Sequence, residues 1–377
     1  MKEKYIIIAS QEYKFANHKN LWGELANQSN VDVIVIDIPA DLIVSVIKRK
    51  KYRLDEAKLG VHKVSNNLYV LRPMLYFRPE FLSDRFLPYL AKNIWKALFK
   101  QFPDIYSCKC NLLIYEAMWA LVFKDSHPNM RIGYYLFDEV RQNGSDGSVN
   151  EKRYRHDEFA CKNSDIIFTM TKCLAESRSN YNSNIIVLGN GAILKESSSL
   201  KPLFIPRSVA FIGNFRNWIN KELLEGLIKK RQDLFFCFVG PIEGNMQKFF
   251  DYLLNNYENV VYFGKVSKET VNRMYKTFGC VIIPYLDNSF IKATRPIKIV
   301  ESIFAGTPVV TIPMDGYQES SFIRFASTEK EFSSEIDYAL SHPIDLDSID
   351  YKSFCNENSW TQKANIIINE FHKLEQM

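Results

Sequence analysis

A lysine and a glutamate three residues apart are the strongest chemical signal in the sequence. Lys298 and Glu301 lie in the stretch "ATRPIKIVESIFAGTPVV", between Pro296 and Gly306. Proline suits the first turn of a helix and glycine suits the position just past its end, so a short helix is predicted here. Side chains three apart share one helix face. The free amides near Ile297 and the positive end of the helix dipole attract anions, so we expect a phosphate site with a carboxylate beside it.

The elements that must position this pair are strands and helices in alternation. Seven β-branched runs precede residue 200, from "YIIIAS" to "NIIVLGNG", and five follow it, from "SVAFIG" to "TPVVTI". Continuous apolar strands that alternate with helices indicate parallel sheets covered on both faces. The stretch "AILKESSSLKPLFIP" interrupts the alternation. The sequence therefore predicts an α/β fold with domains over 1–200 and 201–355, and a last helix over 356–377 that packs back on the first domain.

Further candidate residues follow the predicted strands, because doubly wound sheets bind ligands beyond the carboxyl ends of their strands. In the second domain these positions hold Gly213, Arg216, Gly240, Gly264, Lys265 and Tyr285. Glycine lets a ligand approach the backbone, and the guanidinium of Arg216 suits a diphosphate.

The first domain has three candidates of its own. Asp138 and Glu139 come directly after the run "IGYYLF", and His18 follows the first strand. Asp138 could equally cap the next turn or helix. A single histidine such as His18 is more often a structural residue than part of a site.

Composition excludes several classes of protein. The chain has 377 residues, 46% hydrophobic and 24% charged, which is typical of a globular protein. The glycine patterns of nicotinamide dehydrogenases, P-loop NTPases and serine hydrolases are absent. Seven scattered cysteines and six histidines predict reduced thiols and no metal site. Since no apolar run is long enough to span a membrane and no signal peptide is visible, we expect a cytosolic protein.

The net charge of +5 is concentrated in the first half of the chain. Much of it lies in "KRKKYRLDEAKLGVHK" and "LAKNIWKALFKQF". In the second stretch Lys92, Lys96 and Lys100 are spaced by four, as are Trp95 and Phe99. Such a helix could lie on an anionic membrane surface, or it could be a solvated helix whose aromatic side chains pack inward. The basic residues match no nucleic-acid-binding module, so no nucleic-acid partner is expected.

The second half of the chain resembles the nucleotide-sugar-binding domain of the group 1 (family 4-like) glycosyltransferases. The segments "SVAFIGNFRNW", "NVVYFGKVSKETVNRMY" and "RPIKIVESIFAGTPVV" follow the order of that family, and "NSDIIFTMTKCLAES" resembles the end of its N-terminal domain. The resemblance covers about residues 130 to 315 well. It implies the GT-B fold, in which two Rossmann-like domains face a cleft. The branch it suggests lies near teichuronic acid glycosyltransferases and the xanthan glucuronosyltransferase.

The resemblance also implies roles for individual residues of the second domain. Glu301 would bind the ribose hydroxyls, Lys298 and the amides at the helix start would hold the diphosphate, and backbone groups of Phe263 to Lys265 would contact the base. Many members have a second glutamate where this chain has Ala293. That glutamate belongs to retaining members, whereas the xanthan-type branch inverts.

An inverting reaction needs a base for the acceptor proton. The family often has an acidic pair at the position of Asp138 and Glu139, and of the two we favour Asp138. His18 would border the acceptor site.

The function implied by the resemblance is sugar transfer from a nucleotide-sugar, most simply a UDP-sugar, to a growing, lipid-linked bacterial surface polysaccharide. Members of this fold use no bound metal and no other cofactor. The location implied is cytoplasmic, with peripheral contact at the cytoplasmic face of the membrane. Two alternatives stay open: a nucleotide-sugar 2-epimerase of the same fold, and a non-catalytic partner subunit.

Overall fold

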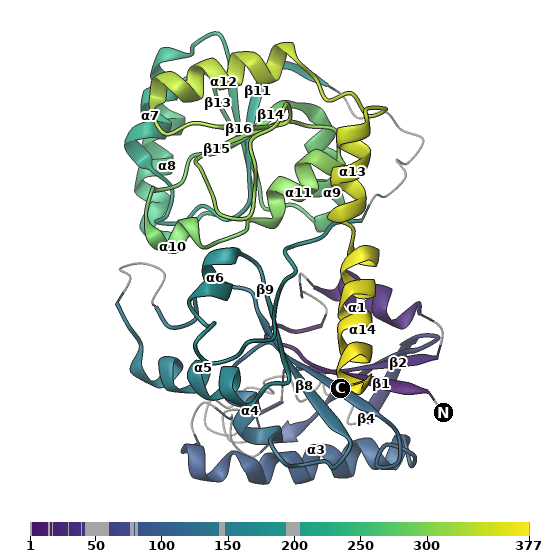
Figure 1. Cartoon of the computed structure of the whole chain (residues 1–377). Helices are drawn as coiled ribbons and strands as arrows, with labels where there is room; N and C mark the ends of the chain where they lie inside the picture. The colour runs from purple at the N-terminus through teal and green to yellow at the C-terminus, as the bar shows by residue number, and fades with distance from the viewer. Residues whose placement is uncertain are drawn as a thin grey trace. The chain divides into compact units, whose positions relative to one another are not determined.

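The structure, a computed structural model, forms two compact units. It describes residues 2–13, 16, 18–28, 30–38, 40–41, 60–75, 79, 82–142, 148–193 and 204–376. The first unit holds the described residues up to Leu188 together with those from Trp360 onward, and the second runs from Gly189 to Ser359. Each unit is built on one main sheet (Figure 1). The basic stretch over residues 48–63 lies outside the described residues except for its last four.

The first unit contains an eight-stranded sheet in the order β10-β9-β8-β7-β1-β2-β5-β4. Neighbouring strands are parallel except at the edge, where β4 pairs antiparallel with β5. The strands are β1 (Glu3–Ile8), β2 (Val31–Ile36), β4 (Gly60–Ser65), β5 (Leu68–Arg72), β7 (Cys110–Ile114), β8 (Met130–Leu136), β9 (Ile166–Thr169) and β10 (Ile185–Val187). A separate parallel pair is formed by β3 (Ala40–Asp41) and β6 (Met74–Leu75). The hairpin edge was not expected, because "GVHKVS" in β4 lacks an apolar run.

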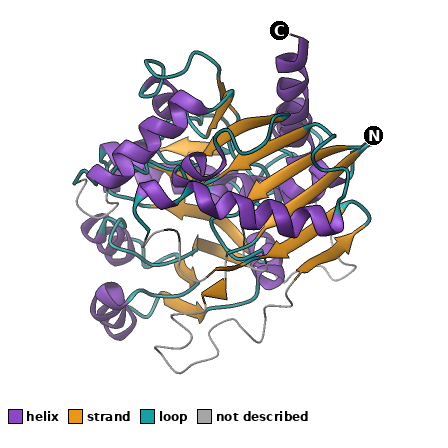
Figure 2. Ribbon diagram, turned by 90° about the horizontal axis from the view of Figure 1, so that it is seen from below, coloured by secondary structure: helices purple, strands orange, loops and turns teal. Residues whose placement is uncertain are grey.

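Helices pack on both faces of this sheet (Figure 2). They are α1 (Lys19–Ala26), α3 (Pro88–Gln101), α4 (Met118–Phe123), α5 (Glu151–Asn163), α6 (Lys172–Glu176) and α14 (Trp360–Gln376), with a 3₁₀ turn η2 (Asp84–Phe86). The last helix, α14, lies beside α1 (Figure 1). Its Phe371 ring is 5.7 Å from the ring of Tyr5 and 6.0 Å from that of Phe168, which holds it on the sheet. Among the described residues, no helix combines the length and hydrophobicity needed to cross a bilayer.

The second unit contains a six-stranded, fully parallel sheet in the order β13-β12-β11-β14-β15-β16. Its strands are β11 (Ile205–Ile212), β12 (Phe235–Val239), β13 (Val260–Gly264), β14 (Phe278–Ile283), β15 (Val309–Thr311) and β16 (Ile323–Phe325). The strand order reverses beside β11, as it does beside β1 in the first sheet. Such a switch point is where open α/β sheets bind their ligands.

The helices of the second unit begin where local sequence favours it. They are α7 (Lys221–Lys230), α8 (Gly244–Asn256), α9 (Lys268–Met274), α10 (Ser289–Lys292), α11 (Ile297–Phe304), α12 (Glu329–Ser341) and α13 (Ile349–Glu357), with a 3₁₀ turn η3 (Tyr275–Thr277). Thr328 and Glu331 form a capping box at α12, which satisfies two free amides. The predicted helix of the phosphate site is α11. It starts after Pro296, and Gly306 follows it with a φ of 84°.

The division between the units differs in detail from the predicted domains. The chain passes from the first unit to the second at Leu188, before the serine-rich stretch rather than near residue 200. The chain returns to the first unit between Ser359 and Trp360, so α13 belongs to the second unit and only α14 to the first. The two crossing segments are tied together, because the Ala192 amide donates to the Asn358 carbonyl over 2.9 Å. This pairing joins positions far apart in sequence, which local composition could not reveal.

Candidate functional site

Three glycines line the carboxyl ends of adjacent strands in the second sheet. Gly213, Gly240 and Gly264 follow or end β11, β12 and β13, and all have positive φ angles, of 143°, 133° and 72°. The Gly240 amide donates to the Gly264 carbonyl over 2.9 Å, so these turns support one another. A Cβ atom on Gly240 would overlap the carbonyl oxygen of Gly213. The glycines therefore leave an edge of bare backbone that a ligand can approach.

Lys298 lies across this edge at the switch point. Its Nζ donates to the Tyr285 hydroxyl over 2.8 Å and lies 4.2 Å from the centre of the Phe211 ring. A Cβ atom on Gly213 would come within 2.6 Å of the same Nζ. Phe211 lies in β11 and Tyr285 lies just beyond the end of β14, and these two strands are adjacent in the sheet. The structure thus brings together Gly213, Tyr285 and Lys298, three residues that the sequence predicts for one site.

Glu301, one turn further along α11, is held by two partners. Its Oε2 accepts a hydrogen bond from the Tyr275 hydroxyl over 3.2 Å, and its Oε1 lies 2.5 Å from Lys268 Nζ. Tyr275 is 2% exposed, and burial followed by the charge of Glu301 raises its pKa well above the usual range. The phenol therefore stays protonated and orients the carboxylate. Glu301 is 14% exposed and is not a freely solvated helix residue.

Arg216 lies in the loop after β11, and its charge is balanced by a neighbouring carboxylate. It forms an ion pair with Glu243, and its guanidinium lies 4.8 Å from the centre of the Trp218 ring. That ring in turn lies 6.4 Å from the ring of Tyr285. Trp218 therefore links Arg216 to Tyr285, which is a partner of Lys298. The Glu243 carboxylate already lies beside the Arg216 guanidinium.

The remaining predicted residues of the second unit are more peripheral. Phe263 is 38% exposed, with its ring 6.0 Å from that of Phe278, and Lys265 is exposed. Both lie at the end of β13, two strands away from β11. Ala293 is buried, at 5% exposure, at the end of α10.

Asp138 and Glu139, the acidic pair of the first unit, lie in two different environments. Both carboxylate oxygens of Glu139 accept hydrogen bonds from the buried Arg178, over 2.6 and 2.7 Å. Burial opposes ionisation of Glu139, but the bonds from Arg178 outweigh it and lower its pKa. Arg178 also donates to Asp157 over 3.2 Å, and Asp157 accepts from Arg141 over 2.6 Å. Because Arg178 binds both of its carboxylate oxygens and lowers its pKa, Glu139 is a poor proton acceptor.

Asp138 has no such partner within the described part of the chain. Burial, followed by the negative charge of Glu139, raises the pKa of Asp138 to about 6. A carboxylate with a pKa closer to neutrality is better matched to general base work than one paired with arginine. Of the two predicted acids, Asp138 is therefore the one whose environment suits that chemistry.

His18 lies in a box of aromatic rings. The centres of the Tyr135, Tyr115, Trp360 and Phe137 rings are 5.1, 5.2, 5.7 and 6.1 Å from its imidazole. Burial lowers the pKa of His18 to about 4, so the ring is neutral at physiological pH. This packing fits a structural residue at the start of α1.

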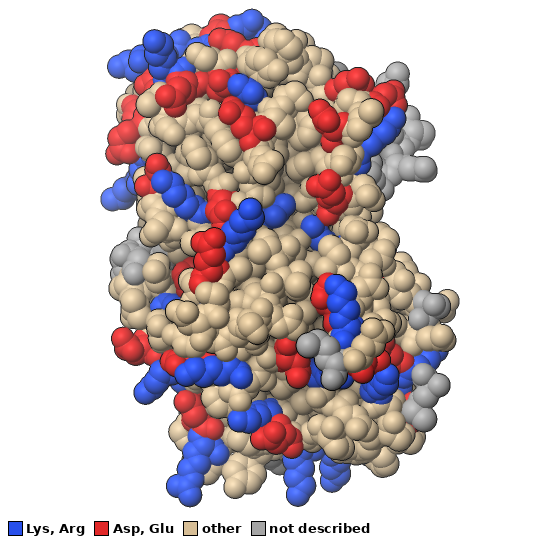
Figure 3. All heavy atoms as spheres, viewed as in Figure 1, with Lys and Arg blue, Asp and Glu red and all other residues tan. Residues whose placement is uncertain are grey.

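The lysine-bearing helix α3 places the side chains of Trp95 and Phe99 in different environments. Trp95 is 2% exposed and donates from Nε1 to Ser126 Oγ over 2.9 Å, whereas Phe99 is 46% exposed. Lys92, Lys96 and Lys100 are all exposed. Figure 3 shows Lys and Arg side chains that project from the edge of the first unit carrying α3.

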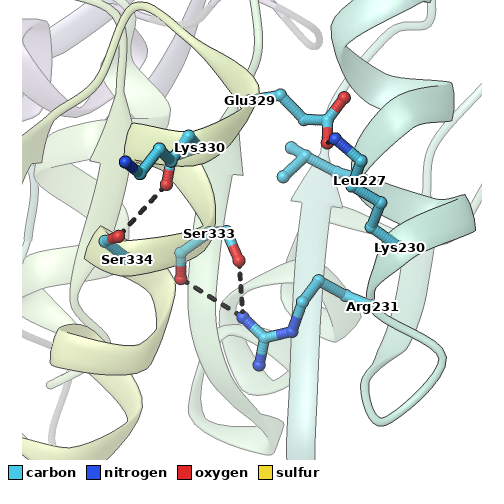
Figure 4. Close-up of a pocket in the computed structure, with 7 residues that line it drawn as sticks. All are labelled: Leu227, Lys230, Arg231, Glu329, Lys330, Ser333 and Ser334. Atoms are coloured by element: carbon cyan, nitrogen blue, oxygen red, sulfur yellow. Dashed lines mark hydrogen bonds and ion pairs between the residues drawn. The ribbon is translucent and has the colours of Figure 1, made fainter.

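A shallow hollow elsewhere on the second unit is not part of this site. It lies between α7 and α12, and Figure 4 shows that its walls are paired with each other. Arg231 Nη1 donates to Ser333 Oγ over 3.0 Å, and Lys230 pairs with Glu329 over 2.6 Å. Its polar groups are already satisfied, and it is far from the carboxyl ends of the strands, so it offers no site for a nucleotide.

Sequence analysis missed three residues of the site. Lys268 and Tyr275 contact Glu301 but lie 33 and 26 residues before it in the sequence. Trp218 lies in the same loop as Arg216 and contacts its guanidinium. A lysine or tyrosine on a short helix is common, and only the sheet order brings these two to Glu301. Trp218 follows a predicted strand end and could have been included on that ground.

Comparison with protein families agrees with this geometry. Residues 206–341 match the family model described as glycosyl transferases group 1. The match covers most of the second unit and confirms the predicted resemblance there. A comparison with curated proteins found no match.

Solved structures share the fold over the whole chain. A sucrose-phosphate synthase from Thermosynechococcus elongatus has a TM-score of 0.71 at 14% identity, covering 100% of both chains. HepE of Anabaena in complex with UDP has a TM-score of 0.63 at 13% identity, covering 99% of this chain and 100% of that one. A candidate UDP-N-acetylglucosamine 2-epimerase from Listeria monocytogenes has a TM-score of 0.57 at 13% identity, covering 100% and 98%. The predicted two-domain GT-B fold is thereby confirmed.

Proposed function

We propose that this protein is a glycosyltransferase that moves a sugar from a nucleoside diphosphate sugar to a glycan acceptor. The observation that carries the proposal is the arrangement on α11. Lys298 lies across Gly213 at the switch point, and Tyr275 orients Glu301 one turn further along the same helix. A cation beside free helix amides suits a diphosphate, and a fixed carboxylate suits the hydroxyls of a ribose.

The donor is most simply a UDP-sugar. HepE, a solved structure of the same fold, is a complex with UDP, and the family match over residues 206–341 includes Lys298 and Glu301. The start of α11 and Lys298 would stabilise the charge that develops on the leaving diphosphate, so that no metal would be needed.

Asp138 would act as the base of an inverting reaction. Its carboxylate has a pKa of about 6, and Glu139 beside it is neutralised by Arg178. Deprotonated Asp138 would accept the proton of the acceptor hydroxyl as that oxygen attacks the anomeric carbon, and the nucleoside diphosphate would leave from the opposite face. The buried Ala293, in place of a second glutamate, agrees with this stereochemistry.

The acceptor would be a lipid-linked surface glycan, as in the teichuronic acid and xanthan branch. Support comes from α3, whose exposed Lys92, Lys96 and Lys100 accompany the 46% exposed Phe99 and the 71% exposed Tyr89. Cations with aromatic side chains on one helix suit the anionic face of a membrane. The protein would then work in the cytoplasm, at the inner face of that membrane.

Nucleotide binding is the first test of this proposal. A thermal-shift screen with UDP, GDP, ADP, CMP and dTDP should give a raised unfolding midpoint with one of the diphosphates, because a ligand of the folded state stabilises it by mass action. The shift should be lost in Glu301→Ala. Absence of any shift would favour a non-catalytic partner subunit.

A 2-epimerase is the second candidate function, on the ground that a candidate epimerase shares the fold. The two enzymes differ in what they need. An epimerase turns over its nucleotide-sugar without acceptor and yields another nucleotide-sugar, whereas a transferase releases the nucleoside diphosphate. Conversion of a UDP-sugar to its epimer, followed by NMR with no release of UDP, would replace the transferase proposal.

A further inference from the structure

Lys268 is the exposed partner of the Glu301 carboxylate. It is the first residue of α9, and its Nζ lies 2.5 Å from Glu301 Oε1. The Lys268 side chain is 55% exposed, compared with 14% for Glu301. A solvated lysine that contacts one carboxylate oxygen contributes little to stability and can move away at low cost.

Tyr275, by contrast, is fixed in place. The phenol is 2% exposed, and its backbone carbonyl accepts a hydrogen bond from Thr307 Oγ1 over 2.6 Å. Ser302 Oγ in turn donates to the Thr307 carbonyl over 2.8 Å, which joins η3 to the end of α11. The orientation of the Glu301 carboxylate therefore depends on Tyr275 and not on Lys268.

We propose that Lys268 is a displaceable counter-ion that competes with the ribose of the nucleotide for Glu301, and so limits the affinity of the site for its donor. This inference rests on the proposed function, because it requires Glu301 to accept hydrogen bonds from the ribose. A vicinal diol donates two hydrogen bonds. Each carboxylate oxygen can accept more than one hydrogen bond, so the diol can bond to Oε2 beside Tyr275, whereas at Oε1 it competes with the Lys268 ammonium group for the lone pairs and the charge.

The position of Lys268 argues against a phosphate-binding role. It contacts the carboxylate of Glu301, which is one helical turn beyond Lys298 and the free amides at the start of α11. Lys298 already supplies a cation at the glycine edge. The charge of Lys268 is therefore placed to neutralise Glu301 before a nucleotide binds.

Calorimetric binding of UDP and of uridine to the full chain tests this inference. Lys268→Gln should bind both ligands about two- to fivefold more tightly than the wild type, the range that an exposed ion pair supplies. Lys352→Gln is the matched control. Lys352 is also an exposed lysine of this unit in an ion pair, 3.2 Å from Asp347, and its replacement should leave both affinities unchanged.

Salt gives a second, independent readout with uridine, which carries no charge. Raising the salt concentration from about 0.05 M to about 0.5 M screens the exposed ion pair, so it should tighten uridine binding to the wild type. The same change of salt should have no effect on uridine binding to Lys268→Gln.

The outcomes separate the possible roles of Lys268. Weaker UDP binding by Lys268→Gln with unchanged uridine binding would mean that Lys268 contacts the phosphates, and it would overturn the inference. Unchanged affinity for both ligands would also overturn it. A wild-type protein that binds neither UDP nor GDP would contradict the proposed function itself, and this inference with it.

Discussion

The replacement Glu301→Gln tests the donor site most directly, because it changes charge without changing size. The amide keeps one acceptor oxygen, so the Tyr275 hydroxyl, 3.2 Å away in the wild type, can still donate to it. A hydrogen bond to a charged group contributes about 1.5–3 kcal/mol, compared with about 0.5–1.5 kcal/mol for a neutral one. For two ribose hydroxyls the loss is about 2–3 kcal/mol, which corresponds to an increase of about 30- to 150-fold in Kd.

The loss of the ion pair with Lys268 in Glu301→Gln reduces the expected increase in Kd. The wild type must displace Lys268 Nζ from its position 2.5 Å from Oε1, whereas the neutral amide attracts the lysine far less. That difference is within about 1 kcal/mol, because the pair is solvent-exposed. The increase in Kd should therefore still be at least about fivefold.

The assay is isothermal calorimetry with UDP and with 2′-deoxy-UDP on the wild type and on Glu301→Gln. The wild type should prefer UDP, and the variant should lose most of that preference, because the 2′-hydroxyl has lost its charged acceptor. Glu329→Gln is the control, since Glu329 forms an exposed ion pair with Lys230 over 2.6 Å, away from the glycine edge. Equal preference for UDP in both proteins, with an unchanged unfolding midpoint, would refute the ribose assignment.

Three further predictions concern Lys298, Asp138 and Gly240. Lys298→Met keeps the packing over Phe211 but removes the charge, so sugar transfer should slow by about 100-fold with little change in the unfolding midpoint; normal steady-state turnover would remove the diphosphate role. Transfer should increase as the pH rises through about 6, where Asp138 loses its proton, and Asp138→Asn should abolish transfer at every pH. Because the folded state binds this proton more tightly than the unfolded state, wild-type stability should fall between about pH 4 and pH 6, and Asp138→Asn should be the more stable protein at pH 7. A thermal midpoint of Asp138→Asn below that of the wild type at pH 7 would contradict a raised pKa of the Asp138 carboxyl. Gly240→Ala should destabilise the second unit by about 1–3 kcal/mol, because its Cβ would overlap the Gly213 carbonyl at a positive φ, and a denaturant titration measures this loss.

Much of the donor side of the site could be predicted from the sequence. Helix α11 follows from Pro296 and Gly306, which act on the backbone around them. The glycines at 213, 240 and 264 follow apolar runs, and parallel sheets place such positions along one edge. Lys298 and Glu301 share one helix, so their proximity needed no knowledge of the tertiary structure.

The acceptor side could be predicted only in part. The run "IGYYLF" locates Asp138 and Glu139 at the end of β8, yet their sequence gives no reason to separate their roles. The difference between the two acids comes from Arg178, which lies 39 residues after Glu139 and donates hydrogen bonds to both carboxylate oxygens of Glu139. Likewise, the four-residue spacing of Trp95 and Phe99 does not reveal that only Trp95 is buried.

The sequence by itself determined the elements, their order and the helix that carries Lys298 and Glu301, because turns, caps and hydrophobic runs depend on near neighbours in the chain. The tertiary structure alone decided which side chains surround those two residues. Lys268 and Tyr275 reach Glu301 because β13 and β14 lie in one sheet on opposite sides of β12 and β11, and α14 returns to the first unit because its Phe371 fits against Tyr5. Such contacts depend on the order in which strands pair, and strand order is set by packing across the whole sheet rather than by any one segment.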